Sequence, residues 1–280
     1  MENDKYYTCR KDKAFKYLFL NESNKNILKA LLEFILKEEI TNIELLPTEL
    51  TNSNIKTKGK QLDALVKTKD KIIGLEMNAN ETDGFRVKNM GYLTNNYSSH
   101  VGVGETYNED MMIMQINFTY GMMHRKEEKD KKGIREYYMQ DKEGKKFVKN
   151  FKIIEINMDY YMEIWYSKNQ KEIEENKFLI MLDLEEKELK DLSKDPVVIK
   201  YMDKLNSLNN DIVFKKLMTE EEEREKYENT IKKNAEAKGI EKGITERNIE
   251  IAKNMLKDNV SIEDISKYTG LLLEEIEKLK

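Results

Sequence analysis

The sequence predicts an α/β fold in which helices flank a sheet, followed by a charged helical extension. Three observations lead to this prediction. Apolar residues recur at helical spacing near the beginning of the chain. Residues 59–80 alternate as two short strands should, and residues 110–121 form an apolar run typical of a buried strand. Beyond Thr219 the chain becomes a charged run with sparse apolar positions.

Two amphipathic helices come first in the chain. The segment "DKAFKYLFL" places Phe15, Leu18 and Phe19 at helical spacing, and residues 21–24 indicate a break and a helix cap. A second helix carries its apolar residues at i, i+3 and i+4 spacing: Ile27, Leu28, Leu31, Leu32 and Ile35. The next segment, "NIELLPTEL", is a strand candidate that Pro47 restricts to an edge or a bulge.

A β-hairpin is predicted next, with strands over residues 61–67 and 71–79 and a polar turn at Thr68–Asp70. Successive side chains of a strand point to opposite faces. Glu76 and Asn78 are therefore expected on the same side of the second strand.

The first strand of this hairpin also carries a carboxylate. Alternation predicts that Asp63 and Leu65 point one way, and that Leu62, Ala64 and Val66 point the other. Pairing of the two strands could then bring Asp63 onto the side of the second acid.

The rest of the chain alternates between helices and strands. Residues 81–100 read as a helix and residues 110–121 as a strand. Aromatic and branched residues predict further strands in "REYYMQD", "KFVKNFKIIEINM" and "YYMEIWY". Helical spacing returns in "KFLIMLDLEEKELKDL" and "VVIKYMDKLNSL".

A boundary is expected near residue 220, between a domain at 1–219 and a charged helical region at 220–280. Ser261 is a suitable N-cap and Gly270 a natural stop for a short helix, after which a second short helix follows. The second helix would present acids to a DNA groove, so packing or self-association is favoured over a helix-turn-helix role. Four apolar residues are expected to form an interface that the tail cannot bury by itself: Leu271, Leu272, Leu273 and Ile276.

Composition limits the class of protein. The net charge of -4 lacks the global basic excess of many nucleic-acid-binding proteins, although local basic patches stay compatible with it. Cys9 is the only cysteine, so an intramolecular disulfide is excluded, and with His100 and His124 it makes a poor structural zinc set. The chain shows neither a signal-like segment nor an apolar run near ~18 residues, so we expect a cytoplasmic protein without a membrane partner.

The two hairpin acids admit two interpretations. Asp63 and Glu76 could hold a hard cation such as Mg²⁺, with the Met77 carbonyl as a further ligand and Asn78 positioning a water. Alternatively, both acids could be solvent-facing strand residues in a highly charged chain. Ile72 shares the face of Glu76, which indicates that this face is partly buried, and buried acids require partners or a metal.

The order of several motifs resembles the Rpn family of recombination-promoting nucleases. These are members of the PD-(D/E)XK nuclease superfamily and are often described as transposases. The resemblance rests on "DKAFKYLFL", "LPTEL", "QLDALVKTKDKIIGLEMN", Arg86, Tyr92 and "MQINF", and on a similar C-terminal region, "KGIEKGI" to "IEKL". It covers almost the whole chain.

This resemblance implies a PD-(D/E)XK-type mixed sheet flanked by helices, built on an αβββαβ core in residues 1–219. It also implies a DNA endonuclease that depends on Mg²⁺ or Mn²⁺ and is linked to recombination or mobile elements. Asp63 matches the metal-binding Asp of the motif, and Glu76 matches the acid of its strand. Asn78 stands where the superfamily usually has Lys and this family commonly has Gln. A homo-oligomer formed through the C-terminal helices is expected as well.

Asn78 is the main departure from the family pattern, because its side chain is shorter than Gln and lacks the positive charge of Lys. Nearby basic residues could supply that charge: Lys60, Arg86 and Lys88. Further acids could join the site: Glu49 and Asp12. The alternative is a catalytically impaired nuclease fold that serves as a DNA-binding or protein-interaction module in phage or defence biology.

Overall fold

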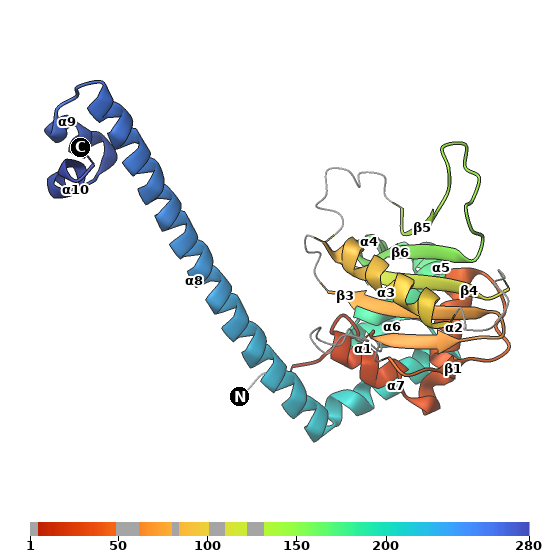
Figure 1. The fold of residues 1–280 in the computed structure, drawn as a ribbon. Helices are drawn as coiled ribbons and strands as arrows, with labels where there is room; N and C mark the ends of the chain where they lie inside the picture. Colours follow the sequence, from red (N-terminus) through yellow and green to blue (C-terminus); the bar gives the residue numbers. More distant parts are fainter. Residues whose placement is uncertain (1–4, 49–61, 80–83, 101–109, 122–131, 280) are drawn as a thin grey trace. The chain divides into compact units, whose positions relative to one another are not determined.

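The computed structural model describes residues 5–48, 62–79, 84–100, 110–121 and 132–279. These residues build a six-stranded sheet flanked by helices, together with a long helix near the C-terminus (Figure 1). The strands are β1 (Glu44–Leu45), β2 (Ala64–Lys67), β3 (Lys71–Asn78), β4 (Met112–Thr119), β5 (Ile134–Tyr138) and β6 (Phe151–Asn157).

The sheet is mixed, which confirms the expected fold class. Its strand order is β1-β2-β3-β4-β6-β5. Strands β1, β2 and β3 are antiparallel neighbours, β3, β4 and β6 run parallel, and β5 is antiparallel to β6. The parallel pair β3 and β4 is joined by a helix, as parallel neighbours require a crossover connection.

Helices cover both faces of this sheet (Figure 1). In chain order they are α1 (Asp12–Phe19), η1 (Glu22–Asn24), α2 (Lys25–Leu36), α3 (Phe85–His100), α4 (Met158–Ser167), α5 (Gln170–Ile180), η3 (Met181–Asp183), α6 (Glu186–Leu192), α7 (Pro196–Asn210), α8 (Ile212–Lys257), α9 (Ile262–Thr269) and α10 (Leu273–Glu277). The succession α2, β1–β3, α3 and β4 is the expected αβββαβ core.

Alternation along β3 divides the core into two layers. Ile73, Leu75 and Met77 belong to the large apolar cluster that includes residues of α1, α2 and α4–α7. Ile72 belongs instead to a smaller cluster with Tyr92 and Leu93 of α3. Glu76 and Asn78 share the parity of Ile72, so β3 directs them to the α3 face.

The predicted hairpin is confirmed. Ala64 pairs with Leu75 and Val66 with Ile73, and Thr68 N donates to Lys71 O at 2.8 Å across the turn. The restriction that Pro47 imposes is also confirmed, because β1 is a two-residue strand at the edge of the sheet.

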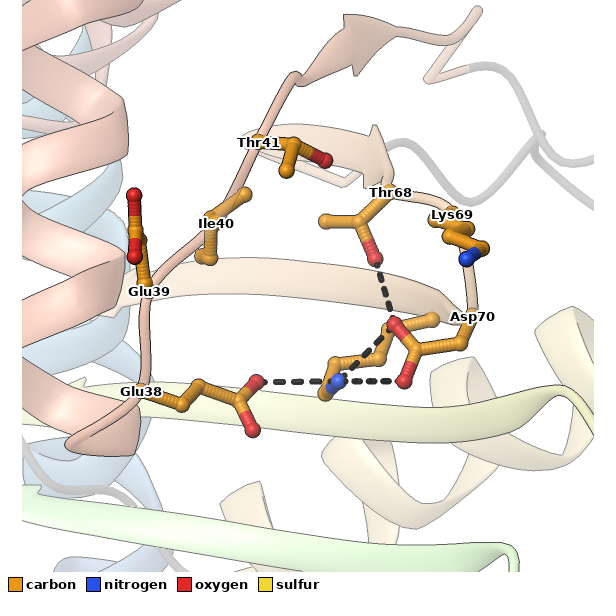
Figure 2. Close-up of a pocket in the computed structure, with 8 residues that line it drawn as sticks. Glu38, Glu39, Ile40, Thr41, Thr68, Lys69 and Asp70 are labelled. Carbon is orange, nitrogen blue, oxygen red and sulfur yellow. Dashed lines mark hydrogen bonds and ion pairs between the residues drawn. The ribbon is translucent and has the colours of Figure 1, made fainter.

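The turn of the hairpin lines a shallow pocket with residues that follow α2 (Figure 2). Lys71 Nζ lies 2.8 Å from Asp70 Oδ2 and 2.9 Å from Glu38 Oε1, so it ties the turn to the segment after α2. Lys71 begins β3 and Glu76 is five residues further, roughly 17 Å at the usual rise of a strand. The pocket therefore does not belong to the site of the paired acids.

The strand predicted for "YYMEIWY" is wrong, because these residues lie in α4. The buried positions of α4 follow helical spacing: Met158, Tyr161, Met162, Ile164 and Trp165. Asn157 caps the helix by accepting a hydrogen bond from Tyr160 N at 3.3 Å. Tertiary packing of this face overrides the strand preference of aromatic and branched residues.

The expected direction of Leu62 is also wrong. Leu62 was expected to share a face with Ala64 and Val66, but it lies in the α3-side cluster with Leu65 and Ile72. Strand β2 begins only at Ala64, so strand alternation does not extend back to Leu62.

The chain divides into two compact units, Met1–Phe214 and Lys215–Lys280. The second unit contains most of α8, together with α9 and α10. Ser261 caps α9 by accepting from Asp264 N at 3.1 Å, and Gly270 ends it with φ 73°. The function expected for residues 220–280 stays a prediction. In the described residues we find no helix with both the length and the apolar character needed to cross a membrane.

The expected apolar interface of the tail needs correction. Leu271 and Ile276 are buried within the second unit, in a cluster with Ala252 and Ile265. Leu272 and Leu273 stay 66% and 44% exposed. The tail therefore buries half of the four-residue set by folding α9 and α10 against the end of α8.

Candidate active site

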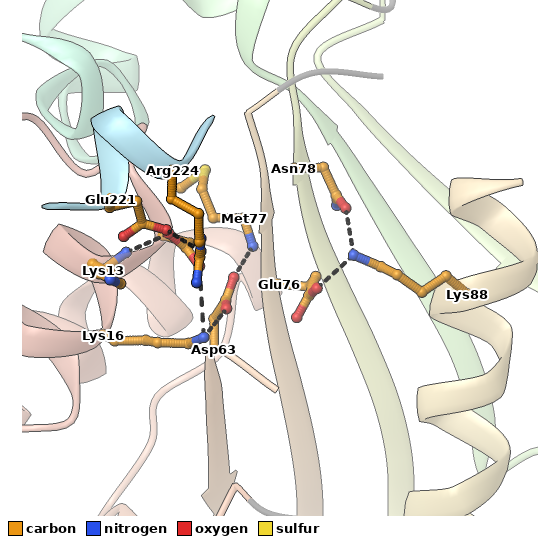
Figure 3. A network of polar contacts seen from close by, with 10 residues as sticks. Lys13, Lys16, Asp63, Glu76, Met77, Asn78, Lys88, Glu221 and Arg224 are labelled. Carbon is orange, nitrogen blue, oxygen red and sulfur yellow. Dashed lines mark hydrogen bonds and ion pairs between the residues drawn. The ribbon is translucent and has the colours of Figure 1, made fainter. Parts of the chain in front are cut away.

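The two hairpin acids lie at the end of β3, where the strand pairing brings them together (Figure 3). The register pairs Ala64 with Leu75, which places Asp63 next to Glu76 across the two strands. Both side chains are buried. Each carboxylate approaches a different helix, since Asp63 contacts α1 and Glu76 contacts α3.

Asp63 is held from two directions. Its Oδ2 accepts a hydrogen bond from Met77 N at 2.6 Å, and its Oδ1 lies 3.0 Å from Lys16 Nζ of α1. Burial raises the pKa of Asp63, and the opposing effects of Lys16 and the Met77 N–H do not cancel this rise. The pKa of Lys16 is raised as well: burial acts to lower it, but the Asp63 carboxylate outweighs that effect.

The buried carboxylate of Glu76 has a charged partner at only one of its two oxygens among the described residues. Its Oε1 lies 2.7 Å from Lys88 Nζ, whereas none of the described residues gives its buried Oε2 a hydrogen-bond partner. Burial, and then the nearby Asp63 charge, raise the pKa of Glu76 to about 7, while Lys88 acts in the opposite direction. A carboxylate in this state favours an additional positive charge close by.

Asn78 lies beside Glu76 on the same side of β3, as strand alternation predicts (Figure 3). Its Oδ1 is 3.5 Å from Lys88 Nζ, a long contact, and its buried Nδ2 has no partner among the described residues. Lys88 itself remains 44% exposed. Lys88 of α3 thus brings a positive charge close to Asn78.

Of the sequence candidates, Asp63, Glu76, Asn78 and Lys88 are brought together. Asp12 is half-exposed and reaches the pair only indirectly, through Lys16 Nζ at 3.7 Å from its Oδ2. Arg86 points to Glu155 of β6 rather than to the paired acids. Glu49 and Lys60 lie outside the described residues.

Sequence reasoning did not select Lys16 or Glu155, both of which bind charged groups in or near the site. Lys16 follows Asp12 by four residues in "DKAFK", so the two share a side of α1 and Lys16 could have been inferred from that spacing. Glu155 stands in the strand "FKIIEIN" on the face of Phe151 and Ile153. An acid on an otherwise apolar strand face is the signal that could have identified it.

This arrangement can bind a divalent cation. Two buried carboxylates with incomplete compensation offer the oxygen ligands that Mg²⁺ prefers. Across the ranges that the structure describes, no group of three or more His, Cys, Asp or Glu residues is placed to hold a metal ion. A cation here would therefore depend on the acid pair, backbone oxygen and water.

Comparison with known proteins gives a family for this chain. No curated protein and no solved structure matched the chain. A family model described as "PD-(D/E)XK nuclease family transposase" matches residues 9–242, which is most of the chain and includes both acids. The chain belongs to the PD-(D/E)XK nuclease family transposases.

Proposed function

We propose that the chain is a DNA endonuclease of the Rpn type, dependent on Mg²⁺ or Mn²⁺, that hydrolyses phosphodiester bonds during recombination or mobile-element activity. One observation carries the proposal. The Glu76 carboxylate is buried with Oε2 lacking a partner among the described residues, beside a second buried carboxylate and a lysine of α3. Family membership gives the same class of reaction.

The residues fit a divalent ion. Asp63 and Glu76 would hold it, and the unpartnered Glu76 Oε2 is an available ligand. The N–H and C=O of one strand residue point to the same side, and the Met77 N–H points to Asp63, so the Met77 carbonyl is a suitable third ligand. When bound, the ion lowers the pKa of a water and stabilises charge on the phosphate.

The remaining side chains have separate roles in this proposal. Hydrolysis forms a bond from a water oxygen to phosphorus and breaks the bond to the leaving sugar oxygen. The Asn78 amide orients the water, and the Lys88 ammonium stabilises the negative charge that develops on the phosphate. Lys16 opposes the rise that burial causes in the pKa of Asp63.

Plasmid nicking with and without Mg²⁺ tests the proposal. We expect Asp63→Asn and Glu76→Gln to lose cutting and Lys88→Ala to reduce it by about 10²-fold or more, the usual effect of removing one group that stabilises transition-state charge. Glu22→Gln is the matched control, because Glu22 is an exposed acid paired with Lys25 far from β3 in the sequence. Equal cutting by the wild type and both acid variants would refute the proposal. If the protein binds DNA without metal but does not cleave it with any divalent ion, the alternative is favoured: a catalytically impaired nuclease fold that serves as a binding module.

We also propose that the second unit supports a homo-oligomer. Leu272 and Leu273 are adjacent apolar residues that the tail leaves exposed. A Leu272→Glu/Leu273→Glu variant should have the mass of a monomer in light scattering if this surface pairs. The same mass for the variant and the wild type would contradict the proposal.

A further inference from the structure

Arg86 forms a second charged arrangement on the α3 face. Its Nε donates to Glu155 Oε1 and its Nη2 to Glu155 Oε2, both at 3.0 Å, which is a bidentate pair. Tyr137 OH donates to Glu155 Oε2 at 3.0 Å. Glu155 is buried, whereas the Arg86 side chain is 45% exposed. A buried carboxylate therefore fixes an arginine that still faces solvent.

Strand register relates this pair to the acid site. Glu76 of β3 pairs with Asn117 of β4, and Asn117 pairs with Glu155 of β6, so the two acids occupy one row across three neighbouring strands. Neighbouring strands lie about 5 Å apart, which separates the two acids by roughly 10 Å. Successive phosphates of a DNA strand are spaced by ~3.4 Å along the helix axis, so this separation corresponds to a few nucleotides.

The charge around Glu155 favours an anion. Arg135 of β5 is the direct cross-strand partner of Glu155, and directly opposed residues point to the same face. Arg135 is thus a second basic residue on the face of Glu155. Arg86 also lies in the first turn of α3, a helix of 16 residues whose first turn contains no acid. The N-terminal end of a helix attracts negative charge.

The chemistry of arginine is well suited to a phosphate ligand. Its planar guanidinium has five donors in a rigid fork that matches phosphate oxygens. Glu155 binds one edge of the Arg86 guanidinium and so fixes its orientation before a ligand binds. This reduces the entropy lost on binding.

We propose that Arg86, oriented by Glu155, binds a backbone phosphate a few nucleotides from the phosphate that is cut. Arg86 is then a positioning residue for the strand, and not a group that takes part in the bond-breaking step. This inference rests on the nucleic-acid substrate of the proposed function.

Binding of a fluorescently labelled DNA duplex, followed by anisotropy over a range of salt concentrations in EDTA, tests the inference. Arg86→Gln should weaken binding several-fold and reduce the slope of log affinity against log salt by about 0.9, the value for one phosphate contact. Arg86→Lys should keep the slope but bind more weakly, because lysine cannot form the bidentate pair. The control is Lys152→Gln, which removes a positive charge from the opposite face of β6.

A structural role alone predicts a different result. Arg86→Gln would then lower the melting temperature but leave the salt slope equal to that of the wild type, and this outcome overturns the inference. Wild-type binding by both Arg86 variants overturns it as well. Plasmid cutting by the wild type separates the two proposals. If the wild type cuts with Mg²⁺ and the salt slope of Arg86→Gln equals that of the wild type, only the phosphate site is refuted. If the wild type does not cut and the salt slope of Arg86→Gln is reduced, only the nuclease activity is refuted.

Discussion

Only one oxygen of the Glu76 carboxylate has a partner among the described residues. That partner is Lys88, which lies in α3 and not in β3, the strand that carries Glu76. Asn78 stands where the resemblance to the family predicts a basic or amide side chain, and it is one methylene shorter than Gln. In the folded chain Lys88 contacts Glu76 and approaches Asn78, so α3 brings a positive charge next to both side chains.

The stability of the metal-free protein should depend on the ionisation of Glu76. Its pKa rises from an ordinary value of 4.5 to about 7 on folding, so between these values the folded chain holds a proton that the unfolded chain releases. The resulting stability, about 3 kcal/mol, is present below pH 4.5 and is lost as the pH rises through about 7. Thermal unfolding from pH 4.5 to 8 should show this fall in the wild type and less of it in Glu76→Gln. Parallel curves for the two proteins would contradict the prediction.

Gly74 shares the α3 face of β3 and leaves room for a buried amide. A Cβ at this position would lie 2.3 Å from Gln115 Oε1 and 3.0 Å from Asn96 Nδ2. Both side chains are fully buried, so neither has space to retreat. We expect Gly74→Ala to lower the free energy of unfolding by about 1–3 kcal/mol, measured by urea denaturation. The double variant Gly74→Ala/Gln115→Ala should lose less free energy of unfolding than the sum of the losses in the two single variants. Strictly additive losses would show that the added Cβ does not clash with Gln115.

At the scale of elements, the site depends on how α1 and α3 meet the hairpin. Strand β3 presents Glu76 and Asn78, but α3 delivers Lys88 from one face and α1 delivers Lys16 to the neighbouring Asp63. The α3 layer is unusually polar, since Asn89 and Asn96 are buried there without hydrogen-bond partners among the described residues. Buried amides of this kind often bond to ordered water.

The attachment of the N-terminal segment to α7 provides a test at this scale. Asn209 Oδ1 accepts from Tyr7 N at 2.7 Å, and its Nδ2 donates to Tyr7 O and to Leu205 O, each at 2.9 Å. Asn209→Ala leaves the buried backbone groups of Tyr7 without these partners, so we expect a loss of about 2–4 kcal/mol in chemical denaturation. The adjacent, exposed Asn210→Ala is the control and should change stability by under about 1 kcal/mol. Similar losses for both variants would show that the Asn209 contacts contribute little.

At the scale of the whole molecule, each of the two compact units has its own apolar core. The core of the first unit packs the sheet against α1, α2 and α4–α7. The core of the second consists of a few residues from the end of α8, α9 and α10. Small cores bury little surface, so the second unit should be much the less stable of the two.

Ile265→Ala should therefore unfold the second unit locally. Ile265 is fully buried in the small cluster, and truncation of such a residue costs about 2–5 kcal/mol. Hydrogen exchange should become faster in α9 and α10 while the protection of β3 and β4 is unchanged. Ile262→Ala, at a position only partly buried, is the milder control. Loss of protection in the sheet of the Ile265 variant would show that the two units unfold together.

Local spacing was enough to predict the hairpin, its turn and the shared side of Glu76 and Asn78, because the two-residue period of a strand is a property of the backbone alone. The order of motifs added the family and singled out Asp63. Spacing failed where packing decides conformation, as in the helix of "YYMEIWY" and at Leu62. It could not show that Lys16 binds Asp63, that Lys88 rather than Arg86 binds Glu76, or that Glu155 orients Arg86. Those pairs join separate elements, and only the packing of α1 and α3 against the sheet brings their charges within bonding distance.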